Sequence, residues 1–476
     1  MGEALGLTLR WVAQAVGGEL RGSISEQQVG NVVIDSRVVL AGDIFVALRG
    51  ERYDAHDFVA QVIEKGAVGI VVERGRLPAV EVGQSGQGNK GFAFIEVGDT
   101  TTALQDLARA VRRASGTRVI AITGSAGKTT TKEAVAELLP KRLRIAKNKG
   151  NLNNHIGLPI SLLQLRERPD VAVMELGMNH AGEISTLVGI AEPETRVWTN
   201  VGDAHIGFFQ SADAIADAKA EILERAEPGH LLVCNADDAR IRARVAGFGG
   251  RTVTFGTSSD AMVRAVDVET LGIDGMRARV VTAAGERQLR TPLLGRGNLS
   301  NVLAAAAVAL EFGSTLDEIV ESAASLKPAD RRGVVVRLRD GVVMLDDSYN
   351  SSPSALAKAL ETIAADKTHV SRKVAVVGEM LELGEHALRL HREAGKTAAA
   401  AGLRLLFAVG GPPARAVADA AIEAGMPASA VRYAEKSELG AEEIAAAILP
   451  GDLVLVKGSR GTRTDIVADR IATVFA

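Results

Sequence analysis

The stretch RVIAITGSAGKTTTKE, residues 118–133, constrains the fold more strongly than any other part of the sequence. An apolar run at 118–123 is followed by a glycine-rich turn and then by a stretch that favours a helix. A continuous apolar run of this length is typical of a parallel strand buried on both faces. Backbone N–H groups at the start of the following helix bind anions well. The stretch therefore predicts a phosphate-binding loop in an α/β domain.

The loop departs from the usual pattern G-x-x-x-x-G-K-[ST], because Ile122 stands where the first glycine is expected. Gly124 and Gly127 still allow the backbone to approach a phosphate closely. Lys128 would contact the β and γ phosphates, and the Thr129 hydroxyl would bind Mg²⁺. We predict that the nucleotide is bound by Gly124, Ser125, Ala126, Gly127, Lys128, Thr129 and Thr130.

Two other interpretations of this stretch are weaker. A nucleotide switch that binds GTP would also need a guanine-reading N-K-x-D motif. The nearest match, NKGN at 148–151, has Asn151 where aspartate is required. A simple glycine turn would leave the run TGSAGKTT between a strand and a helix unexplained.

Composition limits the class of protein. The chain has 476 residues, enough for about three domains, and its net charge of -3 gives no general attraction to nucleic acid or to anionic membranes. The single cysteine, Cys234, indicates a reducing compartment and is expected to be a small buried residue of a strand. No apolar run reaches the roughly 18 residues that span a bilayer. We expect a cytoplasmic protein that is not an integral membrane protein and has no nucleic-acid partner.

The chain alternates apolar runs with helical stretches from end to end, which predicts an α/β protein. We predict a small α/β domain at 1–100, a central parallel-sheet domain with the phosphate loop at 101–326, and a Rossmann-like domain at 327–476. Within the last two domains, polar loops follow the apolar strands. Binding residues of open α/β sheets gather at the carboxyl ends of strands, so both domains are expected to bind ligands.

The shortened loop T-G-S-x-G-K-T resembles that of the Mur ligase family, ATP-dependent enzymes that join amino acids or dipeptides to the peptidoglycan precursor. The resemblance implies three domains, which bind the UDP-sugar, ATP and the incoming amino component. It also makes the missing glycine a trait of the family.

The resemblance implies a metal site with two Mg²⁺ ions. Glu175 ends the apolar run DVAVME, and a carboxylate there is the oxygen ligand that a hard cation prefers. By resemblance Glu175 binds one Mg²⁺, and His205, in the loop after RVWTNV, binds a second. The lysine of related ligases at the position of Lys219 is carbamylated, so an N-carboxylysine that faces the metals is expected there.

Two asparagine-containing stretches match the family. NKGNLNNHIGLP resembles the substrate loop, where Asn151 and Asn154 would lie near the phosphates or the UDP-sugar peptide. GRGNLSNVLAA resembles the helix on the adenine side, with Asn298 and Asn301 in matching positions. The family usually has histidine where this chain has Gly297.

The third domain contains the strongest local match, PADRRGVVVRLRDGVVMLDDSYNSSPSA. By its spacing to Asp346, Arg332 would reach the γ-phosphate, and a planar, permanently charged guanidinium suits developing phosphoryl charge. The nucleotide ribose and the reaction site would be lined by Asp347, Tyr349 and Asn350. The stretches VVGEMLELG, with the later His391, and VKGSRGTRTD resemble the wall that receives the dipeptide; the second contains Lys457, Ser459 and Arg460.

The first domain also matches. DSRVVLAGDIFVALRGERYDAHDF resembles the UDP-sugar-binding domain of the family, with Ser36 and Arg37 near the diphosphate. DDSYNSSP and GEMLELG resemble the member that adds D-alanyl-D-alanine to UDP-N-acetylmuramoyl-tripeptide, and the D-N-P-R motif of the diamino-acid-adding member is missing. These molecules are the expected partners of a monomeric enzyme. The predicted catalytic residues are Lys128, Arg332, His205, Lys219 and Asn154.

Three alternatives stay open at this point. A relative that adds a single diamino acid, or a folylpolyglutamate-type ligase, would use the same loop, although the UDP-sugar-like first domain argues against the folate version. A nucleotide switch or binding module is disfavoured by the candidate metal ligands. A catalytically silent homologue is disfavoured because Lys128, Glu175, His205 and Lys219 are all present.

Overall fold

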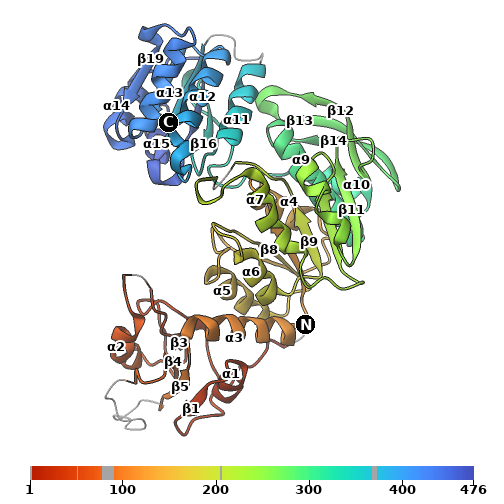
Figure 1. Ribbon diagram of the computed structural model, residues 1–476, viewed down its shortest axis with the longest axis vertical. Helices are drawn as coiled ribbons and strands as arrows, with labels where there is room; N and C mark the ends of the chain where they lie inside the picture. The colour runs from red at the N-terminus through yellow and green to blue at the C-terminus, as the bar shows by residue number, and fades with distance from the viewer. Residues whose placement is uncertain (1–2, 51, 78–90, 204–205, 367–371) are drawn as a thin grey trace. The chain divides into compact units, whose positions relative to one another are not determined.

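The computed structural model describes residues 3–50, 52–77, 91–203, 206–366 and 372–476. The chain forms two compact units. Its helices and strands are labelled in Figure 1. The first consists of residues 1–121, 141–178 and 183–195, and the second of residues 122–140, 179–182 and 196–476. The described strands form three sheets of five, nine and six strands.

The five-stranded sheet lies in the N-terminal part of the first unit and has the order β1-β5-β4-β3-β2. Neighbours from β2 to β5 are parallel, and β1 pairs with β5 in the antiparallel sense. Its core contains Phe45, Ile70 and Phe94, all fully buried. The elements are α1 (Leu9–Ala15), β1 (Glu19–Arg21), β2 (Val32–Val33), β3 (Ile44–Val46), α2 (Val59–Glu64), β4 (Gly69–Glu73) and β5 (Ala93–Val97).

The nine-stranded sheet has the order β14-β13-β12-β11-β10-β9-β6-β8-β7. Its strands are β6 (Arg118–Thr123), β7 (Ile145–Lys147), β8 (Val171–Glu175), β9 (Thr195–Trp198), β10 (Leu231–Asn235), β11 (Arg251–Gly256), β12 (Val263–Thr270), β13 (Met276–Thr282) and β14 (Gly285–Thr291). The strands expected from apolar runs are present. The antiparallel extension β12-β13-β14 was not predicted, because its strands have one exposed face and lack a continuous apolar run.

Helix α3 precedes the first strand of this sheet, and the other helices of the region come after strands in sequence, as the βα pattern predicts. They are α3 (Thr100–Ser115), α4 (Lys128–Leu138), α5 (Gly157–Leu163), α6 (Glu183–Ala191), α7 (Ala212–Ala220), α8 (Ala239–Arg242), α9 (Gly295–Glu311) and α10 (Leu316–Ala324). Helix α9 is alanine-rich and largely buried, and it packs against α4. Small side chains allow this close approach, so α9 supports the helix that carries the phosphate loop.

The six-stranded sheet has the order β15-β16-β20-β17-β18-β19, parallel except for the edge strand β15. Its strands are β15 (Val334–Arg337), β16 (Val343–Asp347), β17 (Arg372–Gly378), β18 (Leu405–Val409), β19 (Val431–Ala434) and β20 (Asp452–Lys457). Its helices are α11 (Pro353–Ala365), α12 (Ala387–Ala400), α13 (Pro412–Glu423), α14 (Ser437–Ala447) and α15 (Thr464–Val474).

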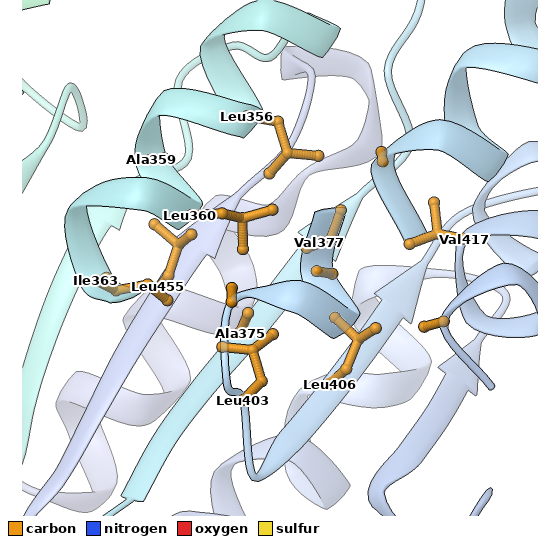
Figure 2. Close-up of a cluster of buried hydrophobic side chains, with 14 of the residues drawn as sticks. Leu356, Ala359, Leu360, Ile363, Ala375, Val377, Leu403, Leu406, Val417 and Leu455 are labelled. Carbon is orange, nitrogen blue, oxygen red and sulfur yellow. The ribbon is translucent and has the colours of Figure 1, made fainter. Parts of the chain in front are cut away.

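Helices cover both faces of this sheet because side chains alternate along each strand. On one face, Val377 and Leu455 pack with Leu360 of α11 and Val417 of α13 (Figure 2). On the other face, α14 and α15 cover a second cluster, which includes Val376 and Val456 of the same strands. Burial on both faces explains why the inner positions of these strands are apolar, as at 374–377 of β17 and 453–456 of β20.

The three-domain α/β architecture expected from the sequence is confirmed, while the boundaries at residues 100 and 326 stay a prediction. In the described part of the chain, none of the helices combines the length and the apolarity that crossing a membrane requires.

Candidate active site

The loop between β6 and α4 has the backbone that its glycines permit. Gly124 has φ 152° and Gly127 has φ 81°, a region that residues with a Cβ rarely adopt. A Cβ on Gly124 would lie 1.9 Å from Oγ1 of Thr199, and a Cβ on Gly127 would lie 2.3 Å from Oδ1 of Asn301. Both positions therefore exclude a side chain on conformational and on steric grounds.

Asn200 and Thr199, which were not among the expected site residues, hold this loop in place. Asn200 accepts a 2.9 Å hydrogen bond from the Ala126 N–H and donates a 2.8 Å bond to the Ala126 carbonyl. The Thr199 hydroxyl donates to the same carbonyl at 3.1 Å. Both residues directly follow β9. The rule that functional residues gather at the carboxyl ends of parallel strands would have found them.

Lys219 is buried beside the phosphate loop. Its side chain lies in α7 and is only 1% exposed. Burial, together with the positive charge of Lys128, holds the pKa of Lys219 well below its usual range. The Lys128 ammonium group donates a 2.9 Å hydrogen bond to the Gly124 carbonyl. The environment therefore favours an uncharged amine at Lys219.

Glu175 is held by two asparagines of the 148–154 loop. Its carboxylate is buried, and Oε1 accepts a 2.8 Å hydrogen bond from Nδ2 of Asn153. Asn148 bonds to both backbone groups of Glu175, at 3.0 Å to the N–H and 3.1 Å to the carbonyl. The sequence indicated Asn151 and Asn154 in this loop, whereas the structure places Asn148 and Asn153 against Glu175. The exposed Asn154 instead accepts a 2.8 Å bond from the Gly157 N–H at the start of α5.

The two asparagines of α9 lie one turn apart and touch each other. Asn301 donates to Oδ1 of Asn298 at 3.1 Å, and Asn298 donates to the Leu294 carbonyl at 2.9 Å. Since Asn301 also borders Gly127, the structure places it against the phosphate loop. A side chain at Gly297 would meet Lys358 at ordinary contact distance, 3.7 Å from its Cδ.

In the six-stranded sheet, the ends of two neighbouring strands form an ion pair. Lys457, at the end of β20, is 3% exposed, and its ammonium group lies 2.6 Å from Oδ2 of Asp347, at the end of β16. The same group donates to the Asn350 carbonyl at 3.0 Å. Ser459 accepts a 2.9 Å hydrogen bond from the Leu381 N–H. The polar residues expected at these strand ends therefore do lie together.

One expectation for this domain stays a prediction and another changes. Asp346 pairs with Arg331 at 3.4 Å, and the contact of the neighbouring Arg332 with the γ-phosphate stays a prediction. His391 was grouped with the wall of the dipeptide site, but its ring is fully buried and accepts a 2.9 Å hydrogen bond from the Met380 N–H. A fully buried ring cannot line a binding surface, so His391 acts by fixing the loop after β17.

In the N-terminal domain, the turn with Ser36 and Arg37 is tied down from two sides. Arg37 forms a 2.7 Å ion pair with Asp35, and its hydrogen bonds lower the pKa of that carboxyl to about 2. The Lys65 ammonium group donates to the carbonyls of Ser36 and Arg37, at 2.8 and 3.0 Å. Lys65 lies far away in sequence, and its role had no sequence signal.

The motif Asp54-x-His56 forms a second tie in this domain. Nδ1 of His56 lies 2.6 Å from Oδ1 of Asp54, and Nε2 accepts a 3.0 Å hydrogen bond from the Glu73 N–H. With Nε2 as the acceptor, the proton is on Nδ1, and the ring joins the loop to the end of β4.

Of the expected metal ligands, His205 lies outside the described residues.

Three family models match successive parts of the chain: "Mur ligase family, catalytic domain" at residues 28–112, "Mur ligase middle domain" at 122–309 and "Mur ligase, glutamate ligase domain" at 331–460. The UDP-N-acetylmuramoyl-tripeptide--D-alanyl-D-alanine ligase of Bacillus subtilis is 32% identical over 98% of this chain and 98% of its own length. The chain belongs to the Mur ligase family.

Solved structures of Mur ligases agree in fold. MurF from Acinetobacter baumannii superposes with a TM-score of 0.87 at 30% identity, covering 99% of this chain and 100% of that one. MurF ligase from Thermotoga maritima, solved in complex with ADP, gives a TM-score of 0.80 at 29% identity, covering 93% and 97%. The resemblance inferred from the shortened phosphate loop is therefore confirmed along the whole chain.

The donors present in this Mur ligase fit Mg²⁺. Glu175 and Thr129 offer oxygen atoms, which Mg²⁺ prefers, and neither is a soft ligand. Within the described ranges, His, Cys, Asp and Glu side chains do not gather in groups of three or more. Mg²⁺ typically keeps several waters and binds one or two carboxylates together with substrate phosphates.

Proposed function

We propose that this protein joins D-alanyl-D-alanine to UDP-N-acetylmuramoyl-tripeptide, with hydrolysis of ATP to ADP and phosphate. The observation that carries the proposal is the phosphate loop, built without its usual first glycine and with a buried lysine, Lys219, beside it. The choice of substrates is supported by relatives named UDP-N-acetylmuramoyl-tripeptide--D-alanyl-D-alanine ligase, which are similar over 98% and 85% of this chain.

The chemistry follows from the low reactivity of a carboxylate towards an amine. The terminal carboxylate of the tripeptide attacks the γ-phosphorus of ATP, so an acyl phosphate forms and ADP leaves. The amine of the dipeptide then attacks the acyl carbon, loses a proton, and expels phosphate from a tetrahedral intermediate. No protein nucleophile takes part.

The chain's contribution is to bind, orient and stabilise charge. The backbone of residues 124–130 cradles the phosphates, with Lys128 on the β and γ groups. Arg332 stabilises the transferring phosphoryl group. Asn298, Asn301 and Asp347 bind the rest of the nucleotide, and Asn154 orients the substrate at the reaction centre. An acyl phosphate hydrolyses readily, so the site must exclude water while it exists.

Two Mg²⁺ ions would be held by Thr129, Glu175, His205 and Lys219 as its carbamate. Bound there, they would neutralise the charge of the transferring phosphate. The burial of Lys219 supports the carbamate, because only the uncharged amine reacts with CO₂. The product then has a carboxylate-like group that can face a cation.

The substrates would be divided among the domains. Ser36 and Arg37 of the first domain bind the UDP-sugar, and Asn151 lies near the phosphates or the peptide. Tyr349, Asn350, Ser459 and Arg460 border the reaction site and the dipeptide. We place the reaction in the cytoplasm, in a monomeric enzyme.

The test is release of phosphate from ATP by the purified protein with Mg²⁺ and UDP-N-acetylmuramoyl-tripeptide, with and without D-alanyl-D-alanine. We expect release that depends on both substrates, and a pentapeptide product by mass. If a single diamino acid or a folate supports turnover and the dipeptide does not, the acceptor is wrong. If the protein binds ATP and no acceptor supports turnover, it is a nucleotide-binding homologue.

A further inference from the structure

The two carboxylates at the end of β16, Asp346 and Asp347, are both paired with cations. Asp346 pairs with Arg331, whose guanidinium also bonds to Asp469 at 2.8 Å. Asp347 pairs with Lys457 at 2.6 Å. Asp346 and Asp347 therefore each have a cationic partner, and neither carboxylate needs another arginine to balance its charge.

Those arginines are Arg332 and Arg460, and both lie over the same aromatic ring. The guanidinium carbon of Arg332 is 4.1 Å from the centre of the Tyr349 ring, and that of Arg460 is 5.7 Å from it. Among the residues that the structure describes, neither guanidinium forms an ion pair or a side-chain hydrogen bond. The two positive charges thus share one aromatic ring and have no carboxylate partner in the described part of the chain.

The backbone fixes this arrangement. Arg331 adopts a left-handed conformation, with φ 52°, and its carbonyl accepts a 3.1 Å hydrogen bond from the Tyr349 N–H. The bond joins the arginine turn to the loop that carries the ring. The two adjacent arginines consequently make different contacts. Arg331 forms ion pairs with carboxylates, and Arg332 packs on the Tyr349 ring.

We propose that Tyr349 is a positioning residue whose ring holds Arg332 and Arg460 as a two-guanidinium clamp for the dianionic phosphoryl group that is transferred from ATP. The inference rests on the proposed ligase function and deepens it. It assigns Arg460 to the phosphoryl group, not to the dipeptide, and gives Tyr349 a role through the arginines instead of a direct substrate contact.

The physical reason lies in the geometry of the guanidinium group. A guanidinium over a ring face is attracted by the ring's negative face, while its N–H donors remain free at its edge. Such a group is restrained before the anion arrives, so less conformational freedom is lost on binding. Two guanidinium groups balance the charge of a dianion, whereas one would balance that of a carboxylate.

The test compares Tyr349→Phe with Tyr349→Leu, and Arg460→Ala with Arg460→Lys. The clamp needs only the aromatic ring, so we expect kcat/KM for ATP to be about tenfold lower in Tyr349→Leu than in Tyr349→Phe. Arg460→Ala should lower it similarly, with KM for D-alanyl-D-alanine changed by less than about twofold. Arg460 is exposed, so this variant is expected to fold even if Tyr349→Leu does not.

A double-mutant cycle separates positioning from a structural role. In an Arg332→Ala, Arg460→Ala background, adding Tyr349→Leu should cause little further loss, because the ring acts only through those arginines. The matched control is Tyr433→Leu, which removes a ring with Arg415 at a similar 4.2 Å elsewhere in the same sheet domain. We expect this control to leave kcat/KM for ATP unchanged.

Three outcomes would overturn the clamp while the wild-type enzyme turns over normally. They are a Tyr349→Leu enzyme as active as Tyr349→Phe, a loss from Tyr349→Leu that is undiminished in the double-arginine background, and an Arg460→Ala enzyme whose defect is confined to KM for the dipeptide. Failure of the proposed function looks different, because the wild-type protein itself would then show no turnover that depends on the dipeptide.

Discussion

Nδ2 of Asn153 donates a 2.8 Å hydrogen bond to Oε1 of Glu175, the carboxylate expected to bind Mg²⁺. The bond restrains the orientation of the carboxylate. Groups that orient a metal ligand in this way typically contribute about 10–100-fold to metal affinity. We therefore expect Asn153→Ala to raise the Mg²⁺ concentration needed for half-maximal activity about tenfold. Titration of phosphate release with Mg²⁺ measures this, and binding of Mn²⁺ to the variant gives a second readout. An unchanged Mg²⁺ requirement would refute the role.

Lys219→Ala should lose activity about 100-fold or more, because the variant cannot form the carbamate that we expect to face the metals. Added Mg²⁺ should not restore it, whereas a short-chain carboxylic acid should restore part of it by occupying the vacated volume. Incorporation of ¹³C-bicarbonate into the wild-type protein, followed by NMR, tests the carbamate directly. Full activity of Lys219→Ala would exclude the idea.

Gly127→Ala should impair nucleotide binding. The new Cβ would lie 2.3 Å from Oδ1 of Asn301, at a φ of 81°. Strain of about 1–3 kcal/mol at such a position should displace the loop and weaken ATP binding about tenfold. Gly229→Ala is the matched control, since no atom lies within 4 Å of the added Cβ and φ is not positive. Calorimetric titration with ATP compares the two, and equal affinities would contradict the steric argument.

His391 should make the C-terminal domain sensitive to acid. Burial lowers the pKa of this histidine, whose Nε2 accepts the Met380 N–H and whose Nδ1 lies 2.7 Å from the Ala387 carbonyl. The folded protein thus binds fewer protons here than the unfolded chain. Stability is retained above the ordinary histidine pKa of about 6.5 and falls as pH drops towards the lowered folded value. Thermal unfolding from pH 7 to 5 should show a steeper loss for wild type than for His391→Gln. If the melting temperatures of both proteins fell equally with pH, His391 would not be the source of the acid sensitivity.

Cys234 should be unreactive in the folded protein. The side chain is buried in β10, and burial raises the pKa of its thiol to about 11. Because the thiolate is the reacting form, a disulfide reagent at pH 8 should modify the native protein far more slowly than the protein unfolded in guanidinium. Rapid modification of the native protein would show that β10 opens to solvent.

The parallel strands and the phosphate loop could be predicted from short stretches of the sequence. The apolar runs predicted the parallel strands because the inner positions of a strand buried on both faces need apolar residues, as at 171–174 of β8 and 453–456 of β20. The glycines at 124 and 127 predicted the phosphate loop because its backbone conformation is closed to other residues. These features depend on a few neighbouring residues, so a single sequence is enough to find them.

Only the tertiary structure decided which polar groups meet. Asp346 is paired with Arg331 and not with Arg332, and Glu175 is held by Asn148 and Asn153 and not by the asparagines on either side of Asn153. Adjacent residues of the same type are equivalent in a sequence. They become different when a left-handed turn, as at Arg331, or the register of two strands directs each side chain to its own partner. The pairing of charges is set by contacts between residues distant in sequence, and so is the position of Arg332 and Arg460 over the Tyr349 ring. No local pattern encodes these contacts.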